Sequence, residues 1–394
     1  MQIGHLLRHS APRLLPRRMI AAGAAIPLTL GLAGAAAGPH AGFQPPPVKH
    51  VWFIELENEG YKQTFGDPSA DPYLATTLPG MGALLTNYYA VGHDSLDNYV
   101  AQVSGQSPDF ATMNDCGIWT RFQPANHVVT PYGQLAGNGC VYPAAVRTLG
   151  NQLTGAHFTW KAYQQDMGNL PARDHTTETT AGPACGHPAV GTRDDTESAV
   201  PADQYAARHE GFMYFESVIG DRSYCEQHIV SFRPLLHDLT SAARTPAYSW
   251  ITPNLCFDGH DAPCVTGEPG GLTEIDAFLR IWIPQIMNSP AYQQDGLIII
   301  TFDEGTTSQA CCGETAGRSP SHPNVAEPGM TGPGGGRVGA IAISRFIKPG
   351  TVSAVDYNHY SSLRSVEDIF GLAHLGDAAM PQVKPFGPDV YTSP

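Results

Sequence analysis

Six short runs of this 394-residue chain are almost continuously apolar. Strands that are apolar at every position, rather than at alternate positions, are typical of a sheet covered on both faces. The pattern therefore predicts six buried strands. They occupy residues 50–58, 88–91, 157–163, 247–252, 296–305 and 337–344.

Apolar residues at helical spacing lie between these runs, at 96–104, 144–153, 272–289 and 360–373. Strands and helices in alternation indicate a doubly wound α/β architecture, with a mostly parallel central sheet and helices on both faces. Residues 166–210 and 305–336 do not fit the alternation. Both segments are polar and rich in Pro and Gly, so we expect them to be long active-site loops.

The first 37 residues contain four arginines and no acidic residue, followed by an apolar run that ends in small residues. This is the pattern of a cleaved secretory signal, which predicts a secreted, periplasmic or cell-envelope protein. An uncleaved membrane anchor is the alternative, but the run is rich in Ala and Gly. Arg17-Arg18 permits twin-arginine export without requiring it. We expect residues 38–48 to be a Pro-rich linker and residues 49–394 to be one catalytic domain.

Without the signal the chain has 18 Lys and Arg against 36 Asp and Glu, a formal charge of −18. So acidic a surface repels polyanions and argues against nucleic-acid binding. A small anionic substrate is still compatible with this charge, because a bound metal or a few histidines reverse the local field. No later segment is long and apolar enough to cross a membrane, so we expect no stable membrane insertion. We also expect a monomer.

All eight cysteines lie beyond the signal, and an even number in an exported chain predicts disulfides. Cys116 with Cys140 and Cys256 with Cys264 are plausible short-range pairs. The adjacent Cys311 and Cys312 either bridge separately or form a vicinal pair. The sequence leaves this connectivity open.

Polar residues follow several of the predicted strands. Ligands of open α/β sheets bind at the carboxyl ends of the strands, so these side chains are expected to converge at one edge. They are Glu57 and Asn58, His93 and Ser95, Asn254, Asp258, His260 and Asp261, Asp303 and Glu304, and His359.

Each of these residues also has an ordinary structural explanation. A Glu-Asn pair at a strand end is commonly a cap or turn. His260 can simply lie on the surface of a turn closed by a disulfide between Cys256 and Cys264, and His359 can cap a helix. Asp303-Glu304 is the stronger signal, because two adjacent acids directly after an apolar strand are costly near a core without a cation.

Ser95 stands where a strand stops and a helix begins. A helix N-terminus offers unpaired N–H groups and a partial positive charge, so an anion can lie beside the hydroxyl. A serine needs a base or a metal to become a nucleophile. The structural alternative for Ser95 is a simple N-cap. The chain contains no Gly-x-Ser-x-Gly, His-Glu-x-x-His or Walker-type motif, so a serine-triad acyl transferase has little support.

Seven motifs, in order, resemble the phosphoesterase family of secreted bacterial acid phosphatases and phospholipase C-type enzymes, within the alkaline phosphatase superfamily. The likeness runs from about His50 to Gly376. The motifs are "ELENEGY", "VGHDSLDNYVAQVSGQ", "WKAYQQDM", "QYAARHEGFMYF", "ITPNLCFDGHD", "ITFDEG" and "NHYSSLRSVEDIFGLAHLG".

The resemblance implies an alkaline phosphatase-like fold and phosphoryl transfer through a covalent phosphoserine. Ser95 is similar to the family's nucleophile. Asp94 and Asp97 depart from the family, which commonly has Pro there, and they add negative charge beside a phosphate pocket. The implied metal ligands are Glu57, Asn58, Ser95, Asp303 and Glu304. We expect Ser95, His209, His260 and His359 to be catalytic, and His93, Asn98, Asn114 and Asp258 to bind the substrate.

The resulting hypothesis is an exported phosphomonoesterase of the acid phosphatase type, with a small phosphate ester as substrate. It requires one divalent ion, and a second is possible through His260 or His359. Charged histidines would favour activity at mildly acidic pH. The alternatives are a phospholipase C or other phosphodiesterase with the same site, and a non-catalytic binding protein on the same scaffold.

Overall fold

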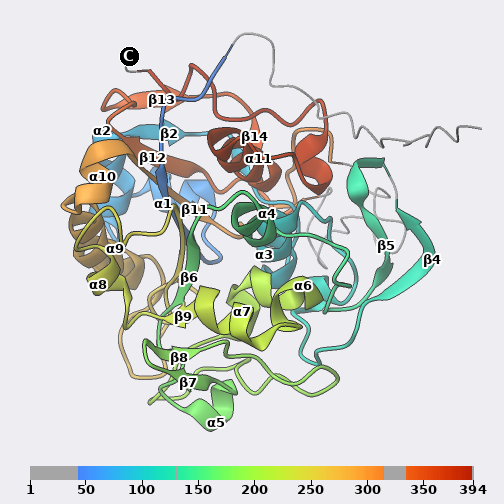
Figure 1. Ribbon diagram of the computed structural model, residues 1–394. Coiled ribbons are helices and arrows are strands. Elements are labelled where there is room, and N and C mark those ends of the chain that lie inside the picture. Colours follow the sequence, from blue (N-terminus) through green and yellow to red (C-terminus); the bar gives the residue numbers. More distant parts are fainter. Residues whose placement is uncertain (1–42, 130, 315–333, 393–394) are drawn as a thin grey trace, which may run out of the picture. The chain divides into compact units, whose positions relative to one another are not determined.

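A ten-stranded sheet organises the chain in this computed structural model, which describes residues 43–129, 131–314 and 334–392 (Figure 1). The predicted signal at 1–37 and residues 315–333 of the second predicted loop lie outside the described residues. The five central strands, β11-β1-β10-β6-β9, are all parallel, whereas β12 pairs with β11 in antiparallel fashion. The strands, in sheet order, are β13 (Thr351–Ser353), β2 (Ala83–Leu85), β12 (Ala340–Ser344), β11 (Gly296–Phe302), β1 (His50–Leu56), β10 (Tyr248–Thr252), β6 (Trp160–Gln164), β9 (Ile229–Ser231), β8 (Gly182–Ala184) and β7 (Thr177–Thr179).

Helices cover both faces of this sheet, as successive residues of β1 demonstrate. Trp52 packs against Tyr292 of α10, while Phe53 stacks on Trp250, which contacts Tyr99 of α3. Figure 1 accordingly places α9 and α10 to one side of β6 and α3, α4 and α11 to the other. The helices are α1 (Tyr61–Gly66), α2 (Leu78–Met81), α3 (Ser95–Ser104), α4 (Leu149–Gly155), α5 (Pro171–Asp174), α6 (Glu216–Ile219), α7 (Arg222–His228), α8 (Leu235–Asp238), α9 (Gly271–Met287), α10 (Pro290–Asp295) and α11 (His359–Phe370), with short turns η1 (Tyr73–Thr77), η2 (Thr112–Asn114), η3 (Pro131–Gly133), η4 (Ala207–His209), η5 (Gly211–Tyr214) and η6 (Gly376–Ala379).

The predicted α/β class is confirmed, and five of the six predicted strands lie in the main sheet. The strand predicted at 88–91 is present but lies outside the main sheet. It is β3 (Tyr88–Tyr89), which pairs with β14 (Tyr357–Asn358) in a separate two-stranded sheet and bridges to Arg337, while β4 (Gln123–Val129) and β5 (Leu135–Asn138) form a third. A run of four residues carries too little pattern to identify its partner.

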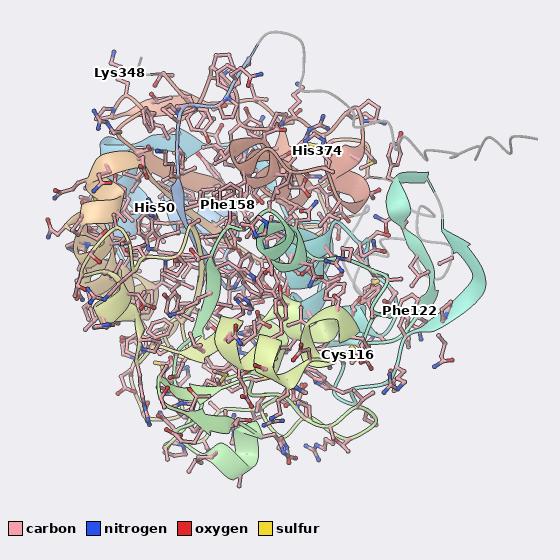
Figure 2. All side chains as sticks on the ribbon, viewed as in Figure 1. His50, Cys116, Phe122, Phe158, Lys348 and His374 are labelled. Atoms are coloured by element: carbon pink, nitrogen blue, oxygen red, sulfur yellow. A yellow bond between two sulfur atoms is a disulfide. The ribbon has the colours of Figure 1, made fainter. Side chains whose placement is uncertain are left out.

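The helix expected over 144–153 begins only at Leu149. Thr148 is its N-cap, since the Thr148 hydroxyl accepts a hydrogen bond from the Asn151 N–H at 3.2 Å. Beyond this helix Phe158, labelled in Figure 2, packs on Phe370 of α11 with ring centroids 4.8 Å apart. The contact links the segment that precedes β6 to helix α11.

Part of the first predicted loop, 166–210, extends the sheet through β7 and β8 instead of remaining irregular. A buried guanidinium holds the rest of this segment together. Arg173 donates hydrogen bonds to the carboxylates of Asp174 and Asp203. It also donates to the backbone carbonyls of Thr196, Ser198 and Tyr205.

All eight cysteines are paired in the structure. The expected pairs Cys116–Cys140 and Cys256–Cys264 are confirmed, and Cys185 pairs with Cys225. Of the two possibilities for the adjacent cysteines, the structure has the vicinal bond between Cys311 and Cys312. Among the described residues no helix combines the length and apolar character that a bilayer span requires.

One buried acid outside the sheet generates a prediction about stability. Both carboxylate oxygens of Asp71 are buried and have no hydrogen-bond partner in the part of the chain that the structure describes. Burial, followed by repulsion from Asp276, raises the Asp71 pKa to about 7. The folded state therefore binds a proton that the unfolded chain releases near pH ~4, so this group lowers stability as the pH rises from about 4 to about 7.

We expect Asp71→Asn to remove this pH dependence, because an amide does not ionise. In urea unfolding the variant should match the parent near pH 4 and be more stable at pH 8. Gln227→Ala, at an exposed residue that does not ionise, is the control and should change stability equally at both pH values. A difference between Asp71→Asn and the parent that is the same at both pH values would contradict the prediction.

Candidate functional site

The centre of the site is the contact between the end of β1 and the start of α3. The Ser95 hydroxyl donates a hydrogen bond of 2.7 Å to Glu57 Oε2. The other carboxylate oxygen, Oε1, accepts a bond of 2.6 Å from the Tyr99 hydroxyl, one turn along the same helix. All three side chains are buried, so the serine rotamer is set from the sheet side.

The turn before Ser95 is built around Asn98. Its Oδ1 accepts hydrogen bonds from the N–H groups of Val91 and Gly92 at 3.0 and 3.1 Å, and its Nδ2 donates to the Gly92 carbonyl. Gly92 has to be glycine because a Cβ there would lie 1.9 Å from the Asp97 carboxylate. Asp94, with φ of 65°, then turns the chain into the helix.

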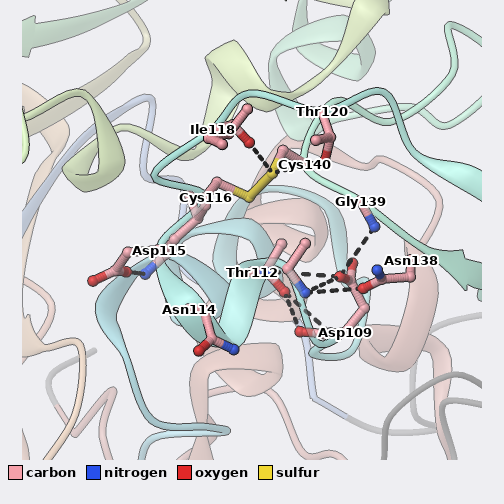
Figure 3. The surroundings of a disulfide bond; sticks show 12 residues. Asp109, Thr112, Asn114, Asp115, Cys116, Ile118, Thr120, Asn138, Gly139 and Cys140 are labelled. Carbon is pink, nitrogen blue, oxygen red and sulfur yellow. Dashed lines mark hydrogen bonds between the residues drawn. A yellow bond between two sulfur atoms is a disulfide. The ribbon is translucent and has the colours of Figure 1, made fainter. Parts of the chain in front are cut away.

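Asp115 caps the helix that Ser95 begins. Its Oδ1 accepts from the Leu96 N–H at 3.0 Å, so a protein carboxylate already occupies this donor at the helix N-terminus. The disulfide Cys116–Cys140 and the hydrogen bonds of Asp109 hold the segment in place (Figure 3). Asn114 extends in another direction from the same turn and donates to the Phe110 carbonyl at 2.7 Å.

Asp303 follows β11 and lies beside the serine. Its Oδ1 accepts from the Asn58 N–H at 2.9 Å, while its buried Oδ2 has no hydrogen-bond partner among the described residues. Ser95 and Glu57 are close enough to interact with this carboxylate. The predicted neighbourhood of Glu57, Asn58, Ser95 and Asp303 is therefore present.

Glu304 contacts a different partner. Its Oε2 forms a hydrogen bond with Nδ1 of His93, which is 2% exposed. The two residues that were expected to bind metal and phosphate separately thus lie against each other. Their pairing connects the turn before Ser95 to the end of β11.

Two of the predicted catalytic histidines are buried with both ring nitrogens in contact. Nε2 of His359 donates to the Asp303 carbonyl at 2.6 Å, and its Nδ1 faces the Tyr88 hydroxyl at 3.3 Å. Nδ1 of His209 lies 3.0 Å from Asp258 and its Nε2 lies 3.4 Å from Glu57. This geometry favours a positioning role for both rings over contact with a substrate.

Burial sets the charge of these groups. It lowers the pKa of His359 to about 4 and that of His209 well below its usual value, so both are neutral in mild acid. The expected electrostatic help from charged histidines therefore does not come from these two.

The cluster of Glu57, Asp258 and Asp303, here called the carboxylate cluster, is short of positive charge. Burial, then mutual repulsion, raises the pKa of Glu57 well above its usual value. Burial likewise raises the pKa of Asp258 and of Asp303. Ligand atoms of Glu57, His209 and Asp258 lie within 4.8 Å of one another. Together with the unpartnered Asp303 Oδ2, this donor set fits a divalent cation.

The residue that the sequence reasoning missed is Arg208. Its guanidinium is 3% exposed, lies 3.4 Å from Asp115, and donates at 3.0 Å to Nε2 of His260. The Nδ1 of His260 bonds to Asp261 at 2.8 Å. The sequence did offer an indication of Arg208, because it directly precedes His209 in the motif "QYAARHEGFMYF".

Comparisons with known proteins agree with this picture at the level of family. A model described as the Phosphoesterase family matches residues 69–373. A phosphate-repressible acid phosphatase of Penicillium chrysogenum is 25% identical over 329 residues, which are 84% of this chain and 62% of that protein. An acid phosphatase of Aspergillus fumigatus is 27% identical over 330 residues, 83% of this chain and 55% of that protein. The chain thus spans less than two thirds of the length of either relative.

Among solved structures, a protein in the alkaline phosphatase superfamily from Vibrio parahaemolyticus is similar with a TM-score of 0.47 and 11% identity. The match covers 86% of this chain and 71% of that one.

The hydrogen bonds of Asn98 generate a prediction, because they serve the turn and not an open pocket. Asn98→Ala should destabilise the fold by about 2 kcal/mol or more in urea unfolding, since two buried N–H groups lose their acceptor. Asn114→Ala, at an exposed position, is the control and should change stability by less than about 0.5 kcal/mol. Wild-type stability of Asn98→Ala with a raised KM would instead support the substrate-binding role expected from the sequence.

Proposed function

Because this chain belongs to the Phosphoesterase family, we propose that it is an exported phosphomonoesterase of the acid phosphatase type, acting through Ser95 and a phosphoserine intermediate. The observation that carries the proposal is the bond from the Ser95 hydroxyl to Glu57, beside Asp303, at the start of a buried helix. Hydrolases that use a serine need its oxygen held and its proton accepted by a neighbour, and both conditions are met here.

The chemistry follows from the Ser95–Glu57 contact. Ser95 Oγ attacks the phosphorus while its proton passes to Glu57 Oε2, 2.7 Å away. Glu57 is the carboxylate in direct contact with the hydroxyl, which places it to accept this proton. The bond from phosphorus to the ester oxygen breaks, and the leaving alkoxide takes a proton from a solvent water, which leaves hydroxide. Hydroxide then attacks the phosphoserine, the bond from phosphorus to Ser95 Oγ breaks, and Ser95 Oγ recovers its proton from Glu57.

The carboxylate cluster also supports a cofactor. A divalent ion would be held by Glu57 and Asp303, with further donors from Asn58 and Ser95, as the resemblance implies, or from Asp258 and His209, whose ligand atoms lie close to Glu57. It would neutralise the buried acids and lower the pKa of the serine hydroxyl. Tyr99 and the Asn58 backbone N–H would keep the two carboxylates oriented toward it. His359 would fix the Asp303 backbone from behind.

Export is proposed on independent grounds. Eight cysteines in four disulfides are typical of oxidising compartments, and all of them follow the predicted signal at 1–37. The names of the relatives support a monoester as substrate, and no geometric observation favours a diester.

Replacing the proposed nucleophile is the direct test. Ser95→Ala should lower kcat for a chromogenic phosphate monoester by on the order of 10³-fold or more, with an unchanged circular dichroism spectrum. Ser217→Ala removes a partly buried hydroxyl that donates to the Val146 carbonyl and has no part in the proposed chemistry, so it should retain activity. Substantial turnover by Ser95→Ala would refute the mechanism, and faster hydrolysis of a diester than of the monoester would favour the phosphodiesterase alternative.

Metal removal should affect stability as well as activity. Dialysis against a chelator is expected to lower Tm, because the carboxylate cluster loses its compensating charge, and readdition of the ion at ~1,000 times its Kd should restore about 4 kcal/mol. In Asp303→Asn the metal-dependent rise in Tm should shrink. Asp368→Asn, at an acid paired with His374, should keep that rise. A Tm that is the same with and without metal would contradict the proposed ion.

A further inference from the structure

Arg208 is a buried cation with unused hydrogen-bond donors. A guanidinium carries five N–H groups. One donates from Nη1 to the Glu197 carbonyl at 2.9 Å and one from Nη2 to His260 at 3.0 Å. The Nε–H makes no hydrogen bond within the described residues, although Asp115 Oδ2 lies 3.4 Å away. A side chain that is 3% exposed therefore keeps three N–H groups available.

The position of Arg208 connects it to the serine by two routes. On one side Asp115 pairs with Arg208 and caps the helix at Leu96, the residue after Ser95. On the other side the His260 backbone N–H donates to Asp258, which also contacts His209. His209 in turn lies beside Glu57, the partner of Ser95. Arg208 thus stands beside a site in which Glu57, Asp258 and Asp303 are all acids.

The contacts of His260 define what this histidine does. Its Nε2 accepts from Arg208, so the proton of the neutral ring lies on Nδ1 and donates to Asp261 at 2.8 Å. Both ring nitrogens are therefore engaged in holding the guanidinium. His260 has no lone pair or proton left for a leaving group in this arrangement.

We propose that Arg208 binds non-bridging oxygens of the phosphoryl group, and that Asp115 and His260 position its guanidinium for this purpose. The inference rests on the proposed function, and it identifies the ligand as a tetrahedral phosphate dianion. Such a planar fork of N–H groups matches phosphate oxygens in geometry as well as in charge. Arg208 replaces Asn114 and His260 as the group that holds these oxygens.

Arg173 shows the hydrogen bonding that is expected of an arginine with a purely structural role. Arg173 is 10% exposed and also binds the segment around residues 196–198. Its two terminal nitrogens, however, make five hydrogen bonds to protein oxygens. The terminal nitrogens of Arg208 make two hydrogen bonds. Arg173 is therefore a suitable control, because protein oxygens occupy its terminal nitrogens more fully.

The test compares Arg208→Lys with Arg173→Lys in the full-length, metal-loaded protein. The measurements are the inhibition constant of inorganic phosphate against a chromogenic monoester and the Tm shift that phosphate produces. Arg208→Lys should weaken phosphate binding by about tenfold or more, since a charge-assisted, bidentate contact is lost. Arg173→Lys should lower Tm and leave the phosphate constant within about twofold. Unchanged phosphate affinity in a folded Arg208→Lys protein overturns the proposal.

A second pair of variants keeps the test valid if Arg208→Lys fails to fold. His260 is 31% exposed, so both His260→Gln and His260→Leu should be tolerated. The Gln carbonyl can still accept from Arg208, whereas Leu cannot. We expect His260→Gln to bind phosphate at least about fivefold more tightly than His260→Leu. Equal affinities would overturn the positioning role.

The outcomes also separate this proposal from the proposed function. If Ser95→Ala keeps its turnover while Arg208→Lys loses phosphate affinity, the nucleophile is wrong and the role of Arg208 is supported. If the wild-type protein binds no phosphate, both proposals are overturned.

Discussion

Burial of three carboxylates at one edge of the sheet is the constraint on which the rest of the structure depends. Glu57 and Asp303 follow β1 and β11, and Asp258 follows β10. These strands are adjacent and parallel, so their carboxyl ends meet, and each acid is withdrawn from water. Ionising such groups is unfavourable without compensation, which is why burial raises their pKa values. Any account of the site has to supply the missing positive charge.

The surrounding side chains orient these acids without neutralising them. Tyr99 and Ser95 bind opposite oxygens of Glu57, and the Asn58 N–H binds Asp303. Hydrogen bonds of this kind fix the direction of a carboxylate but carry no net charge. A preorganised, under-compensated cluster is therefore suited to bind a cation, and the same geometry places the serine oxygen beside it.

Arg208 contributes a buried positive charge within the described part of the site. Two nearby histidines, His209 and His359, have pKa values lowered by burial, so their contribution is geometric. With the proposed ion and phosphate bound, the ion and the guanidinium would together compensate the negative charge of the acids and the substrate. Such an arrangement would allow a chain of so acidic a composition to accept an anionic substrate.

The sequence by itself determined five strands of the main sheet, the helices expected at 96–104, 272–289 and 360–373, and the acids at the strand ends, because apolar runs and their polar termini are local patterns. It also indicated Ser95 at a strand-to-helix boundary. Only the tertiary structure decided which polar side chains face the site. Asn98 turns back to the backbone of Gly92, His359 binds the Asp303 carbonyl from 56 positions away, and Arg208 reaches Asp115. Side-chain direction after a turn depends on partners brought close only by folding, and no local pattern records them.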